Sequence, residues 1–203
     1  MRLDALFPLV LPEVSGCPHP TLMLHLAMAA QRFFMETGAW LVMADEQITA
    51  DGLTEYDVEP ATDAMVIRVR DVWLDSILLK PAKATEAYER NANAAGYTHY
   101  DDRQVLRLEG KPRKGQRLQM RLVIAPKVTS TTIPDALGAR HQISIAHGAK
   151  ASLMVMPNQV WTNPQLGAYH AQMFKDAISD ARIEAIKDGV DLPLVVTKRR
   201  FSY

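Results

Sequence analysis

Histidine, cysteine and acidic side chains could carry catalysis or bind a metal, and their spacing in this chain forms no strong motif. The six histidines are His19, His25, His99, His141, His147 and His170. No two of them stand one helical turn apart, which is the spacing that turns two imidazoles toward one metal ion. His141 falls in an apolar helical stripe, so we expect a hydrogen-bonded core residue there and not a ligand. These patterns predict no metal site and no cofactor.

Nucleophile and phosphate-binding motifs are missing from the sequence as well. Cys17 is the only cysteine, so the chain has no internal disulfide or cysteine zinc site and suits a reducing compartment. The sequence has no glycine-rich phosphate loop and no G-x-S-x-G motif. The run His99-Tyr100-Asp101-Asp102 could gather a cation, but without a second histidine or a glycine-shaped loop we interpret it as a solvated loop. We expect no catalytic residue, although a triad assembled only in space stays open.

One compact group of cations falls where a turn is expected between two strands. It consists of Lys111, Arg113, Lys114 and Arg117. The simplest interpretation is a solvated hairpin tip. The alternative is contact with DNA phosphates or with an acidic partner, which would be sensitive to salt. The whole chain has 23 Lys and Arg against 23 Asp and Glu, so no overall charge favours nucleic acid.

The elements that must position these groups are those of an ordinary folded protein. The chain has 203 residues, of which 48% are hydrophobic and 23% charged, which fits one good-sized domain or two small ones. No run of about 18 apolar residues predicts a transmembrane helix. The apolar start is interrupted by Asp4, Pro8 and Pro12, so it does not fit a signal peptide. We expect a protein made in the cytoplasm without a membrane span.

Three segments have the apolar spacing of helices. The first covers residues 21–36, with Thr21 as the expected N-cap and Gly38 as the expected stop. The second covers 134–156 between two prolines. The third begins at an Asn-Pro pair and covers 163–188. Their apolar stripes are expected to pack on one another.

Between the first and second helices the apolar period changes to two, which indicates strands. Residues 117–124 alternate as a half-buried strand with one wet face. Residues 65–74 also alternate, and the pattern slips one step near Asp71, which predicts a bulge. A further strand is expected at 104–109 and a short helix at 82–95.

Together these elements predict an α+β fold. We expect a helical bundle body formed by residues 1–38 and 133–189, an inserted antiparallel β unit at 39–132, and an extended C-terminal arm at 190–203. The arm is apolar, basic and aromatic through Leu192, Leu194, Val195, Val196, Lys198, Arg199, Arg200, Phe201 and Tyr203. A final strand that closes the β unit is the alternative. We favour an arm that docks on another subunit or another protein, because its apolar content needs a surface to cover.

Six segments stand in an order that is informative as a whole. They are "LFPLVLPEVSGCPHPTLMLHLAMAAQRFFMETGAW", "VIRVRDVWLDSILLKPA", "VLRLEGKP", "LQMRLVIAPK", "IPDALGARHQISIAHGAKASLMVMPNQVWTNPQLGAYHAQMFKDAISDARIEA" and "RRF". In this order the chain resembles the head-to-tail adaptor (connector) proteins of short-tailed phages, similar in role to tail tubular protein A and the head-completion families. The resemblance runs from about residue 6 to residue 201.

The resemblance implies a structural protein of the virion, not an enzyme. Adaptors of this kind form a ring, twelvefold in that family, beneath the portal and extend the DNA channel. They carry the tail nozzle and fibres, and their C-terminal arms embrace the portal. The implied partners are the portal protein, nozzle and fibre proteins, other copies of the chain, and passing genomic DNA contacted without sequence specificity. The implied location is the neck between capsid and tail, after assembly in the host cytoplasm.

Two other classes of function stay open. One is a hydrolase or nuclease whose Asp, Glu and His groups are brought together by the fold. The other is a DNA-binding module that uses the turn from Lys111 to Arg117.

Overall fold

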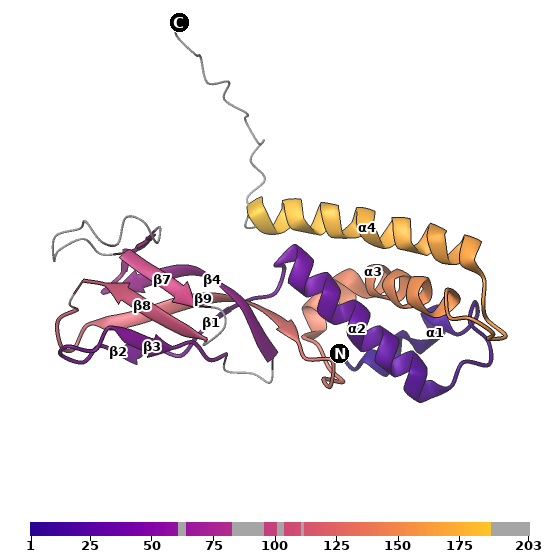
Figure 1. The fold of residues 1–203 in the computed structure, drawn as a ribbon, viewed down its shortest axis with the longest axis horizontal. Helices are drawn as coiled ribbons and strands as arrows, with labels where there is room; N and C mark the ends of the chain where they lie inside the picture. Colours follow the sequence, from indigo (N-terminus) through magenta and orange to yellow (C-terminus); the bar gives the residue numbers. More distant parts are fainter. Residues whose placement is uncertain (61–63, 83–95, 101–103, 111, 188–203) are drawn as a thin grey trace, which may run out of the picture.

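The helices of this protein gather at one end of an elongated molecule and its strands at the other (Figure 1). The computed structural model describes residues 1–60, 64–82, 96–100, 104–110 and 112–187. The helices are η1 (Leu3–Leu6, a 3₁₀ turn), α1 (Phe7–Val10), α2 (His19–Thr37), α3 (Asp135–Met154) and α4 (Pro164–Lys187). The strands are β1 (Leu41–Met43), β2 (Gln47–Ile48), β3 (Glu55–Asp57), β4 (Ala64–Leu74), β5 (Ile77–Leu78), β6 (Lys80–Pro81), β7 (Gly96–Tyr100), β8 (Val105–Glu109) and β9 (Arg117–Pro126). The predicted α+β class is confirmed.

The three long helices pack together through their apolar faces. Phe33 of α2 is fully buried, and its ring lies 4.7 Å from that of His141 on α3 and 6.2 Å from that of Phe174 on α4. His141 is therefore in the core, as predicted, although its described contacts are ring packing. Within the described residues, no helix is long and apolar enough to cross a membrane.

The helix boundaries test the capping predictions. Gly38 ends α2 in the left-handed conformation, with φ of 67°, as predicted. Thr21 as the N-cap is wrong, because α2 begins two residues earlier, after the extended Pro18. Proline fits the first turn of a helix, since its missing N–H has no intrahelical partner there, and Pro20 occupies that turn. At the start of α4, the Asn163 side chain accepts a hydrogen bond of 3.2 Å from the Leu166 amide, as expected of a cap.

Two sheets form the β region. The first has the order β1-β9-β4-β5, with β2 also paired to β9, and the second has the order β3-β8-β7-β6. All described pairings are antiparallel except β6 with β7. The β4–β9 register shifts twice, between Val66 and Arg68 and between Val69 and Asp71, so the predicted bulge near Asp71 is confirmed and a second one precedes it. The predicted strand at 104–109 is confirmed as β8, and most of the predicted helix at 82–95 lies outside the described residues.

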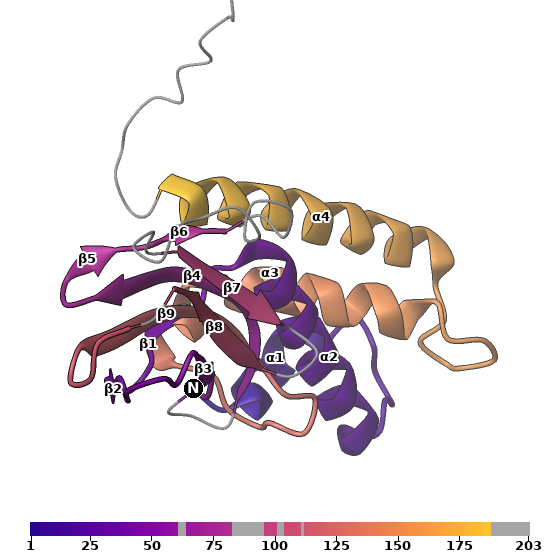
Figure 2. The ribbon, with the colours of Figure 1, turned by 60° about the vertical axis from the view of Figure 1, so that its left-hand side comes forward.

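Strand β9 joins the sheet to the helices. Its first half alternates as predicted, with Leu118, Met120 and Leu122 fully buried. The expected wet face is wrong for its second half, because Val123 and Ala125 are fully buried too. The reason is that α2 packs against this part of β9, so both faces of the strand are covered. Figure 2 shows the helices behind this end of the sheet and α4 above it.

We expect Gly148→Ala to destabilise the helical end. A Cβ at this position of α3 would lie 2.8 Å from the ring of Phe174 and 3.0 Å from the Cβ of Ala29. Such overpacking costs about 1 to 3 kcal/mol, against about 1 kcal/mol gained in helix propensity. Gly167→Ala is the control, because its nearest contact would be 3.3 Å away. Urea unfolding measures both variants, and a Gly148→Ala protein at least as stable as the control would contradict this packing.

Candidate interaction site

The predicted basic turn lies at the tip of the β region, where residues 110–116 connect β8 to β9. Arg113, Lys114 and Arg117 are exposed there, and Lys111 lies outside the described residues. The turn is held by Thr49, the residue after β2, whose hydroxyl donates to the Arg113 carbonyl at 2.5 Å and accepts from the Gln116 amide at 2.9 Å. These hydrogen bonds fix the backbone of the turn that carries the cations.

Asp75 anchors the same turn from the β4–β5 connection. Its carboxylate accepts hydrogen bonds from the Arg117 amide and from the Gln116 side chain, both 2.9 Å long. These bonds lower the pKa of Asp75, the Arg117 amide contributing most. Asp75 and Ser76 both have positive φ, 48° and 68°, as the central residues of a tight hairpin turn require.

Exposed apolar residues surround this basic tip. Ile48 of β2 is 58% exposed, and Ile77 and Leu78 of β5 are 67% and 56% exposed. Arg117 lies 3.8 Å from Glu46, so part of the positive charge is balanced locally. A mixed apolar and charged tip suits contact with a protein better than contact with phosphates alone.

Rows of exposed apolar side chains also cover the outer helices. On α2 they are Leu24, Met28 and Met35, each more than 40% exposed, at positions that share one helical face. On α4 they include Ile183 and Ile186, 45% and 61% exposed. Exposed apolar side chains that share a helix face are candidates for an interaction surface.

The second predicted site, the arm at 190–203, lies outside the described residues. So do Asp101 and Asp102 of the run that begins at His99. Among the described residues, no group of three or more His, Cys, Asp or Glu side chains could hold a metal ion. Cys17 is buried, and burial raises the pKa of its thiol, which is the opposite of what activates a nucleophile.

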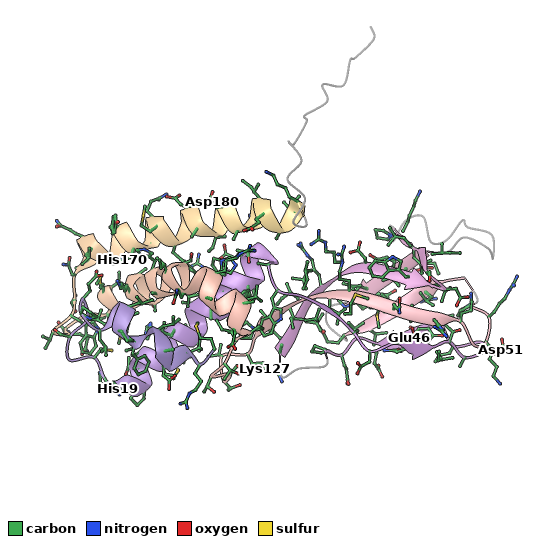
Figure 3. All side chains as sticks on the ribbon, turned by 180° about the vertical axis from the view of Figure 1, so that it is seen from behind. His19, Glu46, Asp51, Lys127, His170 and Asp180 are labelled. Carbon is green, nitrogen blue, oxygen red and sulfur yellow. The ribbon has the colours of Figure 1, made fainter. Side chains whose placement is uncertain are left out.

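A partly buried polar network in the helical end was not predicted from the sequence. Glu13, in the segment before α2, contacts the ammonium of Lys150 on α3. Its other oxygen accepts from His170 Nε2 on α4 at 2.7 Å, and His170 Nδ1 lies 2.7 Å from His147 Nδ1. His170 Nε2–H therefore faces the Glu13 carboxylate, and which of the two Nδ1 atoms donates depends on the protonation of the two rings. Figure 3 shows His170 on the side of α4 that faces the other helices.

The charges and hydrogen bonds of this network favour an ionised Glu13 and a neutral His147. Burial opposes ionisation of Glu13, but the hydrogen bonds from Lys150 and His170 outweigh it and lower its pKa. Burial, with the neighbouring His170 and Lys150, lowers the pKa of His147 and favours its neutral form. Lys150 and His170 are almost fully buried, at 8% and 3% exposure. The group ties three segments together and has the character of a structural network.

Sequence spacing could not reveal this network, because its contacting pairs are 23 to 157 residues apart. The only local signal was a lysine at position 150 within an apolar stripe, since a buried lysine needs a partner. No family model matches the chain, and no curated protein matches it in sequence.

We expect Glu13→Gln to lower stability at neutral pH, because it leaves the buried Lys150 without its counter-charge. The loss is about 2 kcal/mol, typical of a buried group deprived of one partner. The pKa of Glu13 is lowered from 4.5, so its contribution is present above that pH and disappears as pH falls. The difference between variant and wild type, measured by urea unfolding, should therefore shrink below about pH 4.5.

Glu36→Gln is the matched control for this experiment. Glu36 is as exposed as Glu13, 38% against 36%, but its partner Arg32 is itself 67% exposed. Losing a surface pair of this kind costs about 0.5 kcal/mol. Equal losses for the two variants would show that the Glu13 network contributes no more than a surface ion pair.

Proposed function

We propose that this protein is a structural head-to-tail adaptor of a tailed phage, which assembles as a ring beneath the portal and carries the tail nozzle and fibres. The observation that carries the proposal is the pairing of a complete core with rows of uncovered apolar side chains on α2 and α4. A protein that buries its own core and still exposes such rows has surface for neighbouring copies. The order of sequence segments that resembles phage adaptors supports the same conclusion.

Ring assembly requires that two different faces of each copy meet, because the copies are related by rotation and not by a twofold axis. The outer faces of α2 and α4 are two such faces, formed from different helices. The bundle body with its inserted β unit would form the wall of the ring. In this arrangement each added copy buries apolar surface, and each Å² of that surface stabilises the ring by about 25 cal/mol.

The basic tip has a separate role in this proposal. It lies at the end of the β region far from the helices (Figure 1), where it would contact the nozzle or fibre proteins or the passing genomic DNA without sequence specificity. Its apolar border at Ile48, Ile77 and Leu78 favours the protein contact. Its cations could attract DNA only through phosphates, since no recognition helix accompanies them in the described residues.

We expect the purified chain to be monomeric or weakly associating at low micromolar concentration and to form a ring on purified portal. The portal would hold many copies close together, and the high effective concentration would drive weak lateral contacts to completion. Light scattering with and without portal measures this. A stable ring without portal would contradict assembly on docking, and no binding to portal would contradict the adaptor function.

We expect deletion of residues 190–203 to abolish portal binding and leave the fold intact. Ala181 is the last buried residue of the part that the structure describes, and we expect the free energy of unfolding to change by no more than about 0.5 kcal/mol. Phe201 and Tyr203 are the proposed anchors of the arm, since aromatic side chains dominate many interfaces. Calorimetric unfolding and a portal pull-down measure the two effects.

Substitution of the two arginines of the arm tests whether their charge contributes to portal docking. Arg199→Ala with Arg200→Ala should weaken docking and reduce its dependence on salt, whereas Arg199→Lys with Arg200→Lys keeps the charge and serves as the control. Unfolding of the truncated chain would show that the segment is an integral strand. Full affinity after truncation would place the portal contact elsewhere.

A further inference from the structure

Hydrogen bonds that involve backbone carbonyls hold the C-terminal end of α4, the end beside the β region (Figure 1). Arg182 Nε donates to the Glu36 carbonyl at 2.9 Å, and the Ala185 carbonyl accepts from Arg70 Nη1 at 3.1 Å. A guanidinium stays protonated at every ordinary pH, and a carbonyl does not titrate. This attachment of α4 is therefore insensitive to pH.

Titratable side chains hold α4 near its start, at the other end of the helix. His170 Nε2 lies 2.7 Å from the Glu13 carboxylate, and His170 Nδ1 lies 2.7 Å from Nδ1 of His147 on α3. His170 is only 3% exposed, whereas His147 is half-buried. Protons from solvent can therefore reach the pair of rings through His147.

Apolar burial fastens this first part of α4 only weakly. Before Phe174, the buried residues of α4 are Gly167, which has no side chain, and His170. Leu166 is partly buried against the core. The apolar residues that bury α4 deeply, Phe174 and Ile178, come later in the helix. The contacts of His170 are therefore a main attachment of residues 164–173.

The contact between the two Nδ1 atoms limits the number of protons that the pair can hold. A hydrogen bond between two nitrogens needs one N–H and one lone pair. With His170 Nε2–H donating to Glu13, this bond can form when both rings are neutral or when one ring is charged. When both rings are charged, both Nδ1 atoms carry hydrogen, and 2.7 Å between them becomes repulsive. The closed contact therefore holds at most one of the two positive charges.

The groups around His147 also oppose a further proton. Burial, His170 and Lys150 lower the pKa of His147, while Glu13 acts in the opposite direction. The ring of Tyr169 packs beside that of His147, with 6.4 Å between the ring centres. Lys150 itself contacts Glu13, so one carboxylate serves both the ammonium and His170.

The other helices that pack on α3 and α4 carry their titratable groups elsewhere. On α2, His25 Nδ1 lies 2.7 Å from the hydroxyl of Ser152. The guanidinium of Arg32, also on α2, lies over the ring of Phe174 and pairs with Glu36. α1 packs on α3 and has no titratable side chain. The state of the His147–His170 pair is therefore set chiefly by the pair itself, Lys150 and Glu13.

We propose that His147 and His170 form an acid-sensitive latch, whose double protonation releases residues 164–173 of α4 from α3 while the C-terminal end of α4 stays attached. The latch is a conformational device of the helical end. It goes beyond the adaptor function and does not depend on it. Local opening of this kind starts where few apolar contacts hold a segment.

The pH range of the latch follows from the ordinary pKa of histidine. In the open form both rings titrate near a pKa of about 6.5, whereas the closed form holds at least one proton fewer in acid. Opening is therefore favoured as the pH falls below about 6.5, by about tenfold between pH 7.5 and pH 5.5 for a difference of one proton. The pKa of Glu13 is lowered from 4.5, so Glu13 stays ionised throughout this range.

Hydrogen–deuterium exchange of the full chain, measured by mass spectrometry, tests the latch. Exchange is compared at about pH 7.5 and about pH 5.5, after correction for the intrinsic effect of pH on amide exchange. Peptides within residues 164–173 are expected to open about tenfold more at the lower pH. Peptides within 178–187, which Arg70 and Arg182 hold, are expected to change by less than about twofold.

Two asparagine variants separate the latch from other histidines. His147→Asn keeps a hydrogen-bonding group near the position of Nδ1 but cannot gain a proton, so the effect of pH on residues 164–173 should fall below about twofold. His25→Asn is the matched control, because His25 is also partly buried with a 2.7 Å side-chain contact, and burial lowers its pKa too. This control should keep the full effect of pH. Thermal unfolding at neutral pH shows that both variants are folded.

Three results would overturn the latch. The first needs no variant: wild type that opens residues 164–173 equally at the two pH values. The second is an equal increase in opening for residues 178–187, which would mean that the whole helix opens and not one end of it. The third is a folded His147→Asn protein that keeps the full effect of pH, which would assign that effect to another group.

Discussion

The double burial of the end of β9 is the constraint on which the rest of the structure depends. The strand is paired on both sides, by β1 and β4, and its last part is covered by α2. A slip of one residue would carry Arg121 into the core and expose Leu122, so the register is strongly specified. The salt bridge between Arg121 and Asp71 reinforces the same register from the opposite face. Because β9 is fixed in this way, the helices and the sheets hold one relation to each other.

The charges of the chain sum to zero but are distributed unevenly. In the helical end, Glu13 neutralises the buried Lys150, and the pair contributes cohesion between segments. On the β region opposite charges stand close together at the surface, as where Glu55 of β3 lies opposite Arg107 of β8 and Glu46 lies 3.8 Å from Arg117. A partner for a buried charge stabilises the fold, whereas charges balanced at the surface are screened by solvent and contribute less. Zero net charge therefore conceals two different electrostatic designs.

The sequence alone was sufficient for the α+β class, the three long helices, the strands with clear alternation and the bulge near Asp71. It failed for Thr21, because two prolines begin the helix earlier, and for Val123, because the covering helix comes from a distant part of the chain. The pairing of His147 with His170 could not be predicted, since it depends on how two helices face each other. The contact between β4 and α4 could not be predicted either, since only the fold brings Arg70 within 3.1 Å of the Ala185 carbonyl.

The long β4–β9 pairing also decides how the molecule would respond to mechanical load. The two strands run along the long axis, from the tip to the helices (Figure 1). A pull that acts on the tip end of β4 and on the helical end of β9 loads many interstrand hydrogen bonds at once, in shear, instead of opening them one after another from an end. The two bulges interrupt this ladder at fixed points, between Val66 and Arg68 and between Val69 and Asp71, and so mark where it would first yield. The same pairing that sets the register therefore makes the β region a stiff strut.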